Sequence, residues 1–354
     1  MLSYNTIKPL LFKSDPEFAH AFVESCARFS PKIPLLLPFL ASKLCVKDEI
    51  LRQNLCGLDF YNPIGLAAGF DKNATMIEML CACGFSHLEL GAVTPKAQAG
   101  NDKPRLWRHV EAESLQNAMG FNNDGASVIS TRLDSSYPFA IPLGINIGKN
   151  KDTPLEDAIS DYEILAKTFS ENTDYLSINI SSPNTPNLRD LQNESFIKEL
   201  FLKLKDVYKK PIFLKLSPDL EIDEALKLSD CAINYGCDGI IATNTTLDYS
   251  LVANPQDKGG ISGKVLATKS REMLRQIALH LRTQKSKCIL ISVGGIDSAE
   301  EAFCRIKMGA SLVQVYSALI FKGPALVRDI NYNLINLLKK DGFNHISEAV
   351  GASL

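Results

Sequence analysis

The chain has 354 residues, of which 45% are hydrophobic and 22% are charged, and its formal net charge is −2. This composition is sufficient for a large buried core, either in one α/β domain with an appendage or in two ordinary domains. Because a nucleic-acid-binding surface needs a basic excess, we expect no nucleic-acid partner.

The cysteines and histidines give no sign of a metal site or a disulfide framework. Nine cysteines occur at irregular spacing without a C-x-x-C pair, and five histidines occur without an H-x-x-x-H pair. The sequence therefore predicts no bound metal and favours a reducing compartment. No segment is apolar over the length that a membrane-spanning helix requires.

Residues 1–45 differ in pattern from the rest of the chain. Asp15 is suited to cap a helix that begins at Pro16. Four apolar residues then recur on one face of this helix: Phe18, Phe22, Cys26 and Phe29. A second apolar stretch runs from 35 to 44, so we expect a helical hairpin. The pattern alone favours a hairpin packed on the main domain; the alternative leaves an apolar face open to a membrane surface or a lipidic ligand.

Eight short apolar runs alternate with helical patterns after residue 60. The runs are Pro63–Ala68, His87–Val93, Pro142–Ile147, Tyr175–Ile180, Ile212–Leu216, Gly239–Thr243, Cys288–Val293 and Leu312–Tyr316. The clearest helical patterns are Leu155–Phe169, Phe196–Tyr208, Asp223–Tyr235, Thr268–Leu281 and Ala299–Met308. Nearly continuous apolar runs are typical of parallel strands buried on both faces. The alternation predicts an α/β fold, a closed (β/α)8 TIM barrel, rather than an open sheet, because no strand is followed by G-x-G-x-x-G.

The long segment after the second run favours a role at the site, because structureless loops of this length are uncommon. It includes Gly91 to Pro95 and ends in Asn117 to Asn123, and we expect residues 117–121 to wall one side of a substrate.

Polar side chains follow most of the predicted strands, where the active site of such a barrel forms. They are amides, hydroxyls and lysines without a cluster of carboxylates, which argues against a paired-acid glycosidase. Amides and hydroxyls can bind a planar polar heterocycle, and lysines can stabilise negative charge.

The loops after the last three strands predict a phosphate site. Gly294-Gly295 and Tyr316-Ser317 follow strands seven and eight, and Gly259 to Gly263 offers a third, flexible loop. Bare backbone amides at a helix N-terminus favour an anion. A barrel with a phosphate site would still suit sugar-phosphate isomerases, aldolases or pyridoxal-phosphate enzymes.

From about Asp15 to about Pro324, the chain resembles the dihydroorotate dehydrogenases, in particular their quinone-dependent, membrane-associated branch. The motifs that carry the resemblance are Gly65-Leu66-Ala67-Ala68-Gly69 with Asp71-Lys72, Met119 to Asn123, Gly144 to Asn150, Asn179 to Asn184, and Gly294-Gly295-Ile296. The resemblance implies two parts: an N-terminal extension, residues 1–45, that associates with quinone and membrane, and a catalytic barrel, residues 46–354.

The resemblance also implies FMN as the cofactor. The residues that it places around FMN are Ala68, Gly69, Phe70, Asp71, Lys72, Ala92, Asn146, Asn179, Lys215, Thr243, Gly263, Gly295, Tyr316 and Ser317. Members of the family commonly carry a hydroxyl residue where Ala92 stands, so we expect one side-chain contact with the flavin to be lost.

The implied substrate is dihydroorotate, which is oxidised to orotate in pyrimidine biosynthesis. Its implied ligands are Lys72, Asn117, Ala118, Met119, Gly120, Phe121, Asn179, Asn184, Asn244 and Thr245. Ser182 would be the catalytic base, taking a proton from C5 while hydride passes from C6 to the flavin. A free serine is a poor base, so its proton must move on through hydrogen bonds or water. Ala118 replaces a larger side chain found in the family.

Serine at the base position and the N-terminal segment favour the quinone branch, because the soluble branch carries cysteine there. The resemblance places His20, Arg108 and Tyr316 at the quinone site and the protein at the cytoplasmic side of the cell membrane, as a peripheral protein. One alternative is a soluble FMN barrel oxidoreductase that uses fumarate or NAD. Another is a catalytically inactive barrel that serves as a binding scaffold, against which Lys72, Ser182 and Lys215 argue.

Overall fold

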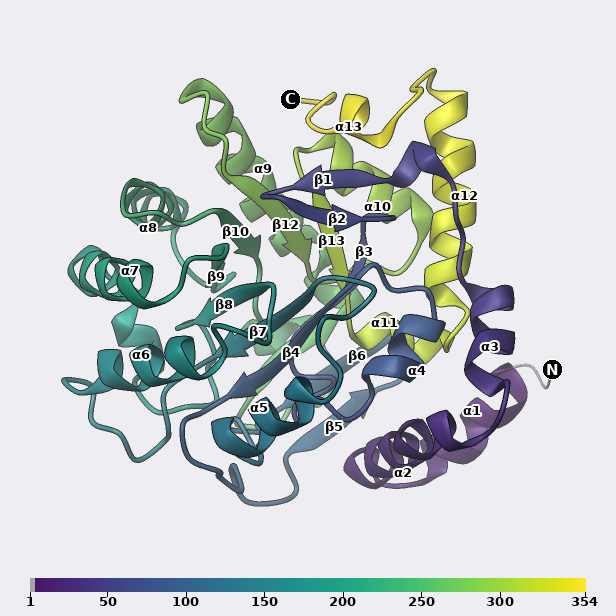
Figure 1. Ribbon diagram of the computed structural model, residues 1–354, viewed down its shortest axis with the longest axis horizontal. Coiled ribbons are helices and arrows are strands. Elements are labelled where there is room, and N and C mark those ends of the chain that lie inside the picture. The colour runs from purple at the N-terminus through teal and green to yellow at the C-terminus, as the bar shows by residue number, and fades with distance from the viewer. Residues whose placement is uncertain (1–3) are drawn as a thin grey trace.

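A closed barrel of eight parallel strands forms the centre of the protein (Figure 1), in a computed structural model that describes residues 4–354. Its strands pair in chain order: β3 (Ile64–Leu66), β4 (His87–Val93), β7 (Leu143–Ile147), β8 (Tyr175–Asn179), β9 (Ile212–Leu216), β10 (Gly239–Ala242), β12 (Ile289–Val293) and β13 (Leu312–Val315). All eight predicted strands are confirmed, and the closure excludes an open sheet. Nearly every strand residue is buried, as apolar runs with a helix layer outside and a packed interior require.

Helices cover the outside of the barrel, as Figure 1 shows. They are α4 (Ile77–Ala82), α5 (Ala126–Asp134), α6 (Ala158–Thr168), α7 (Glu194–Val207), α8 (Ile222–Asn234), α9 (Ala267–Thr283), α10 (Ala299–Lys307), α11 (Ser317–Lys322) and α12 (Leu326–Lys340), with the short α13 (Ile346–Ala349) after them. The five predicted helices form, and each end lies within three residues of its predicted place.

Aromatic side chains fill the N-terminal end of the barrel. Phe60 belongs to a hairpin of β1 (Gln53–Leu55) and β2 (Leu58–Phe60), and it packs in the same buried cluster as Tyr175 and Phe213. The rings of Tyr175 and Phe213 lie 4.9 Å apart. Because this end is packed, the C-terminal ends of the strands are left to form a site.

A small antiparallel sheet lies over that site, and it corrects two expectations. The long segment after β4 contains β5 (Leu106–His109) and β6 (Ser114–Asn117), and Gly260–Gly263 is β11, a strand paired with β6 rather than a flexible loop. Single-sequence patterns miss such a sheet because its strands are only four residues long, and their pairing joins segments distant in the chain.

Three helices form the N-terminal extension: α1 (Tyr4–Lys13), α2 (Pro16–Phe29) and α3 (Leu36–Leu44). The Asp15 carboxylate accepts the backbone N–H groups of Glu17 and Phe18, each at 2.9 Å, so the predicted cap is confirmed. Helix α1 was not predicted, because Pro9 lies inside it and it has no acidic residue in its first turn. Within residues 4–354, no helix has both the length and the apolar character needed to cross a membrane.

Helix α2 does not pack on the barrel through its aromatic face; that face is exposed. Phe18, Phe22 and Phe29 are 66%, 54% and 58% exposed, so the expectation that this stripe packs on the main domain is wrong. Helix α2 instead packs through the small buried residues Ala19 and Ala27. It also makes polar contacts: Arg105 donates to Glu17 at 2.7 Å, and Thr75 donates to Glu24 at 2.7 Å. Helical periodicity reveals an apolar face but not what covers it.

Candidate active site

A cavity opens at the C-terminal ends of the barrel strands, beneath the small sheet. Its empty volume, including the open mouth, is about 1240 Å³. Twenty of the predicted site residues line it: Ala68, Gly69, Lys72, Ala92, Asn117, Met119, Gly120, Phe121, Asn146, Asn179, Ser182, Asn184, Lys215, Thr243, Asn244, Thr245, Gly263, Gly295, Tyr316 and Ser317.

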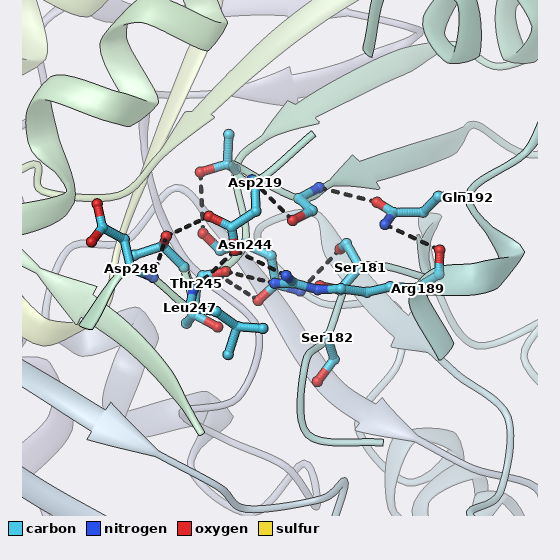
Figure 2. Close-up of polar contacts among 12 residues, drawn as sticks. Ser181, Ser182, Arg189, Gln192, Asp219, Asn244, Thr245, Leu247 and Asp248 are labelled. Atoms are coloured by element: carbon cyan, nitrogen blue, oxygen red, sulfur yellow. Dashed lines mark hydrogen bonds and ion pairs between the residues drawn. The ribbon is translucent and has the colours of Figure 1, made fainter. Parts of the chain in front are cut away.

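Ser182 stands on the loop after β8, and its side chain faces the cavity. Its Oγ accepts the backbone N–H of Asn184 at 3.2 Å. Figure 2 shows Ser182 apart from the neighbouring cluster of polar contacts. Within residues 4–354, no carboxylate or imidazole hydrogen-bonds this hydroxyl, so it has no protein acceptor for its proton of the kind found in a catalytic triad.

Three asparagine carboxamides form a directed chain along the floor of the cavity. Asn146 Nδ2 donates to Glu89 Oε1 at 2.8 Å, and Asn179 Nδ2 donates to Asn146 Oδ1 at 2.9 Å. Asn244 Nδ2 then donates to Asn179 Oδ1 at 3.3 Å. Because a carboxylate can only accept, Glu89 fixes the orientation of every amide in the chain.

The role of Glu89, which lies buried inside the barrel, was not predicted. Its side chain has no exposed surface, and it lies 3.1 Å from the Nζ of Lys215, itself only 5% exposed. Gln314 donates to its other oxygen at 2.8 Å. The sequence did contain a signal for Glu89, because it is the one acidic residue within the apolar run 87–93. A charge buried in such a strand needs a partner.

Unpaired buried polar atoms indicate that the cavity is shaped for a ligand with both donors and acceptors. Asn184 Nδ2 donates to Asn117 Oδ1 at 2.9 Å, while Asn184 Oδ1 and Thr245 Oγ1 are buried without a hydrogen-bond partner among residues 4–354. Leaving such groups unpaired costs about 1–3 kcal/mol each. A polar heterocycle with ring amides would supply the missing partners.

Lys72 brings a positive charge to the same side of the cavity. Burial lowers its pKa from the ordinary value, and the carboxylates of Glu24, Asp71 and Glu17 act in the opposite direction. In the described part of the chain, its ammonium makes no hydrogen bond. It is thus placed to pair with an anionic group of a ligand.

The opposite end of the cavity suits a phosphate. Gly263, Gly294 and Gly295 have φ values of +103°, +108° and +76°, and a Cβ on Gly295 would lie 2.5 Å from Cα of Ala267. Only glycine combines this backbone with so close an approach. Ser262 was not predicted here; its hydroxyl lies 3.0 Å from that of Ser317.

The fully buried Arg305 supports this end from behind. Its Nη2 donates to the carbonyls of Gly294 and Ala267, at 2.9 and 3.0 Å. The C=O and N–H groups of one trans peptide unit point in opposite directions. The hydrogen bond from Arg305 to the carbonyl of Gly294 therefore points the N–H of Gly295 away from Arg305. The sequence did not single out Arg305, because its burial depends on the packing of α10 against the barrel.

Five predicted residues do not line the cavity: Phe70, Asp71, Ala118, His20 and Arg108. The Asp71 carboxylate accepts the backbone amides of Thr75 and Met76, so it shapes the turn after β3. Ala118 is buried, and its N–H donates to Arg105 O at 2.8 Å.

Of the residues predicted for a quinone, His20 lies on α2, Arg108 lies on β5, and Tyr316 lines the cavity. The ring of Phe70 is 5.2 Å from that of His20 and 5.5 Å from that of Tyr316, which lines the cavity. Burial lowers the pKa of His20 to about 4, so its imidazole is neutral at pH 7. Arg108 donates to the carbonyl of Ser14 at 2.8 Å, at the turn between α1 and α2.

Comparison with known proteins gives a consistent result. The family profile described as dihydroorotate dehydrogenase matches residues 50–338. A relative from a Nitratiruptor species, named dihydroorotate dehydrogenase (quinone), is 54% identical over 353 residues, 100% of each chain. One of the same name from Helicobacter acinonychis is 49% identical and covers 99% of both chains. A crystal structure of DHODH from Eimeria tenella in complex with ferulenol has a TM-score of 0.85 at 31% identity, over 99% of each chain.

Replacing Glu89 by Gln should destabilise the barrel strongly. The change leaves the Lys215 ammonium buried without its counter-charge, which typically costs about 3–5 kcal/mol. The measurement is urea unfolding followed by circular dichroism. Glu163→Gln, which breaks the surface pair with Lys167, is the control and should change little. Adding Lys215→Met to Glu89→Gln should recover part of the loss; an unaltered midpoint for Glu89→Gln alone would contradict the assignment.

Proposed function

Because this chain belongs to the dihydroorotate dehydrogenase family, we infer that it oxidises dihydroorotate to orotate, a step of pyrimidine biosynthesis, and delivers the electrons to a quinone. The observation that carries this inference is the full-length identity to relatives named for the quinone reaction, together with Ser182 beside the asparagine cluster. These relatives give no support to the alternative of a soluble enzyme that uses fumarate or NAD.

We propose FMN as the cofactor, and its ring supplies a hydride acceptor when bound. The polar groups that line the cavity and the close glycine contacts at one end support this choice. The phosphate would be held by Gly263, Gly295 and Ser317, and Tyr316 would lie near it. The ring would lie near Ala68, Gly69, Asn146, Lys215 and Thr243, all lining residues.

Dihydroorotate carries one carboxylate and a ring with amide donors and acceptors. Lys72 suits the carboxylate because its ammonium is not engaged by the described protein. Asn117, Asn184 and Thr245 suit the ring, and the last two carry the buried atoms without partners. Asn179 and Asn244 lie within the directed amide chain, so their remaining hydrogen-bonding groups are presented in fixed orientations.

Ser182 acts as the base toward C5 of the substrate in this proposal. Its Oγ accepts from the backbone of Asn184, which fixes the hydroxyl group and leaves its proton free to be passed to water. Ser182 is only 6% exposed, so the reacting atoms are largely shielded from bulk solvent.

The N-terminal extension, residues 1–45, would place the protein on the membrane as a peripheral protein on the cytoplasmic side. The outward aromatic face of α2 supports a contact with the bilayer interface, where exposed phenylalanines are stabilised. His20 and Arg108 would lie beside the quinone, and Tyr316 would lie between it and the cofactor.

The experiment that tests the function is anaerobic reduction of the bound flavin. Purified protein should be yellow, and dihydroorotate should bleach it. A quinone analogue should restore the colour faster than fumarate or NAD. Protein that is colourless and cannot be reconstituted with FMN would refute the proposal, and reoxidation by NAD or fumarate alone would favour the soluble alternative.

Ser182→Ala should slow flavin reduction by about 100-fold to 10,000-fold, the usual contribution of a general base. FMN should stay bound, because Ser182 supports none of the glycine contacts at the phosphate end. Stopped-flow absorbance measures the reduction, and the flavin-to-protein ratio measures binding. Reduction at the parent rate would remove Ser182 from its role.

The outward face of α2 should carry membrane binding. In a Phe18→Ser, Phe22→Ser, Phe29→Ser variant, partition into anionic lipid vesicles should fall on the order of 100-fold or more, since each buried phenylalanine contributes about 1.5–3 kcal/mol. Flavin reduction by dihydroorotate should not change. Val128→Ser with Ile164→Ser, two exposed apolar residues on α5 and α6, is the control. Equal vesicle binding by all three proteins would show that another surface contacts the membrane.

A further inference from the structure

One arginine outside the cavity joins the three loops that follow neighbouring strands β8, β9 and β10. Arg189 lies on the short helix η3 (Leu188–Leu191), and Figure 2 shows its guanidinium at the centre of a cluster of contacts. Nε donates to the carbonyl of Ser181 at 3.0 Å, and Nη2 donates to that of Thr245 at 3.0 Å. Nη1 donates to Asp219 Oδ2 at 2.9 Å.

Asp219 extends this connection around the loop after β10. Its carboxylate accepts the backbone N–H of Leu247 at 2.9 Å, the hydroxyl of Thr246 and the ammonium of Lys269. Burial raises the pKa of Asp219, but the hydrogen bonds from Lys269, Thr246, Leu247 and Arg189 outweigh it and hold that pKa below its ordinary value. The carboxylate is therefore ionised at neutral pH and keeps the guanidinium in place.

The two carbonyls that Arg189 holds belong to the loops that carry the proposed base and two of the proposed substrate ligands. The carbonyl of Ser181 is part of the peptide unit that leads into Ser182. Thr245 is fixed at both backbone groups, because its N–H donates to Asn244 Oδ1 at 2.8 Å while its carbonyl accepts from Arg189. Thr245 lines the cavity, and its Oγ1 is buried without a hydrogen-bond partner among residues 4–354.

We propose that Arg189 is a positioning residue for the reaction: it sets the separation between the base Ser182 and the substrate ligands Asn244 and Thr245. The planar guanidinium makes this possible, because its fixed fork directs three donors to three loops at once. A lysine presents a single flexible ammonium and cannot hold the same three acceptors. Arg189 does not line the cavity, so it acts on the substrate only through these loops. The inference rests on the proposed dehydrogenase function.

The surroundings allow the effect on catalysis to be separated from an effect on folding. Asp219 keeps Lys269 as a cationic partner when Arg189 is changed. The glycines and the arginine at the phosphate end share no contact with Arg189. A loss of positioning should therefore appear in the half-reaction with dihydroorotate, without loss of FMN and without slower reoxidation by quinone.

The test uses full-length, FMN-loaded protein and the variant Arg189→Lys. The limiting rate of anaerobic flavin reduction by dihydroorotate should fall about 10- to 100-fold, as expected for a misplacement of reacting groups by about 1 Å. FMN content and the rate of reoxidation by a quinone analogue should stay within about twofold of the parent, because Arg189 hydrogen-bonds only to the three substrate-side loops among residues 4–354. In a Ser182→Ala background, the same change should slow reduction by less than about threefold, since coupled sites are not additive.

Arg328→Lys is the matched control and should behave like the parent, because this exposed arginine on α12 pairs with its neighbour Asp329 and with no other side chain among residues 4–354. If Arg189→Lys does not fold, Asp219→Asn weakens the same connection from its other end and should reproduce the selective loss. Parent-like reduction in either variant would overturn the proposal. So would a full multiplicative effect in the Ser182→Ala background, or an equal loss of FMN and quinone turnover. A parent protein that dihydroorotate cannot bleach would refute the proposed function itself.

Discussion

A carboxylate with no access to solvent determines the direction of the hydrogen bonds along the floor of the site. Glu89 lies inside the barrel against Lys215, and it can only accept hydrogen bonds. Asn146 must therefore turn its amide nitrogen toward Glu89, and Asn179 and Asn244 follow in the same sense. In a low-dielectric interior, each reversed amide would leave a buried group unpaired, so the orientation of the site is built into the barrel.

A second charged connection joins the loops above this fixed floor, in addition to the apolar packing of Leu188 and Leu191. Arg189 and Asp219 fasten three of them from outside the cavity. The inner connection sets the directions of the amides, and the outer one sets the spacing between Ser182 and its neighbours. The site can thus be polar and rigid at once, which is what catalysis by alignment requires.

The extension shows how a sequence pattern can be right about an element and wrong about its partner. The cap at Asp15 and the helix from Pro16 to Phe29 form as predicted. Its aromatic face nevertheless points to solvent, because Glu17 and Glu24 bind Arg105 and Thr75 of the barrel. The polar contacts that orient this helix come from residues some 50 to 90 positions away, which no local periodicity contains.

The sequence by itself determined the eight barrel strands, their order and most residues of the cavity, because continuous apolar runs that end in polar residues are local features. Ser182 and most of the asparagines could be located because they follow those runs closely, and the resemblance to the family supplied their roles. Only the tertiary structure revealed the roles of Glu89, Arg189 and Arg305 and the sheet of β5, β6 and β11. The role of a buried charge or of a short strand depends on a partner that is distant in the chain. Only the folded barrel brings the two together.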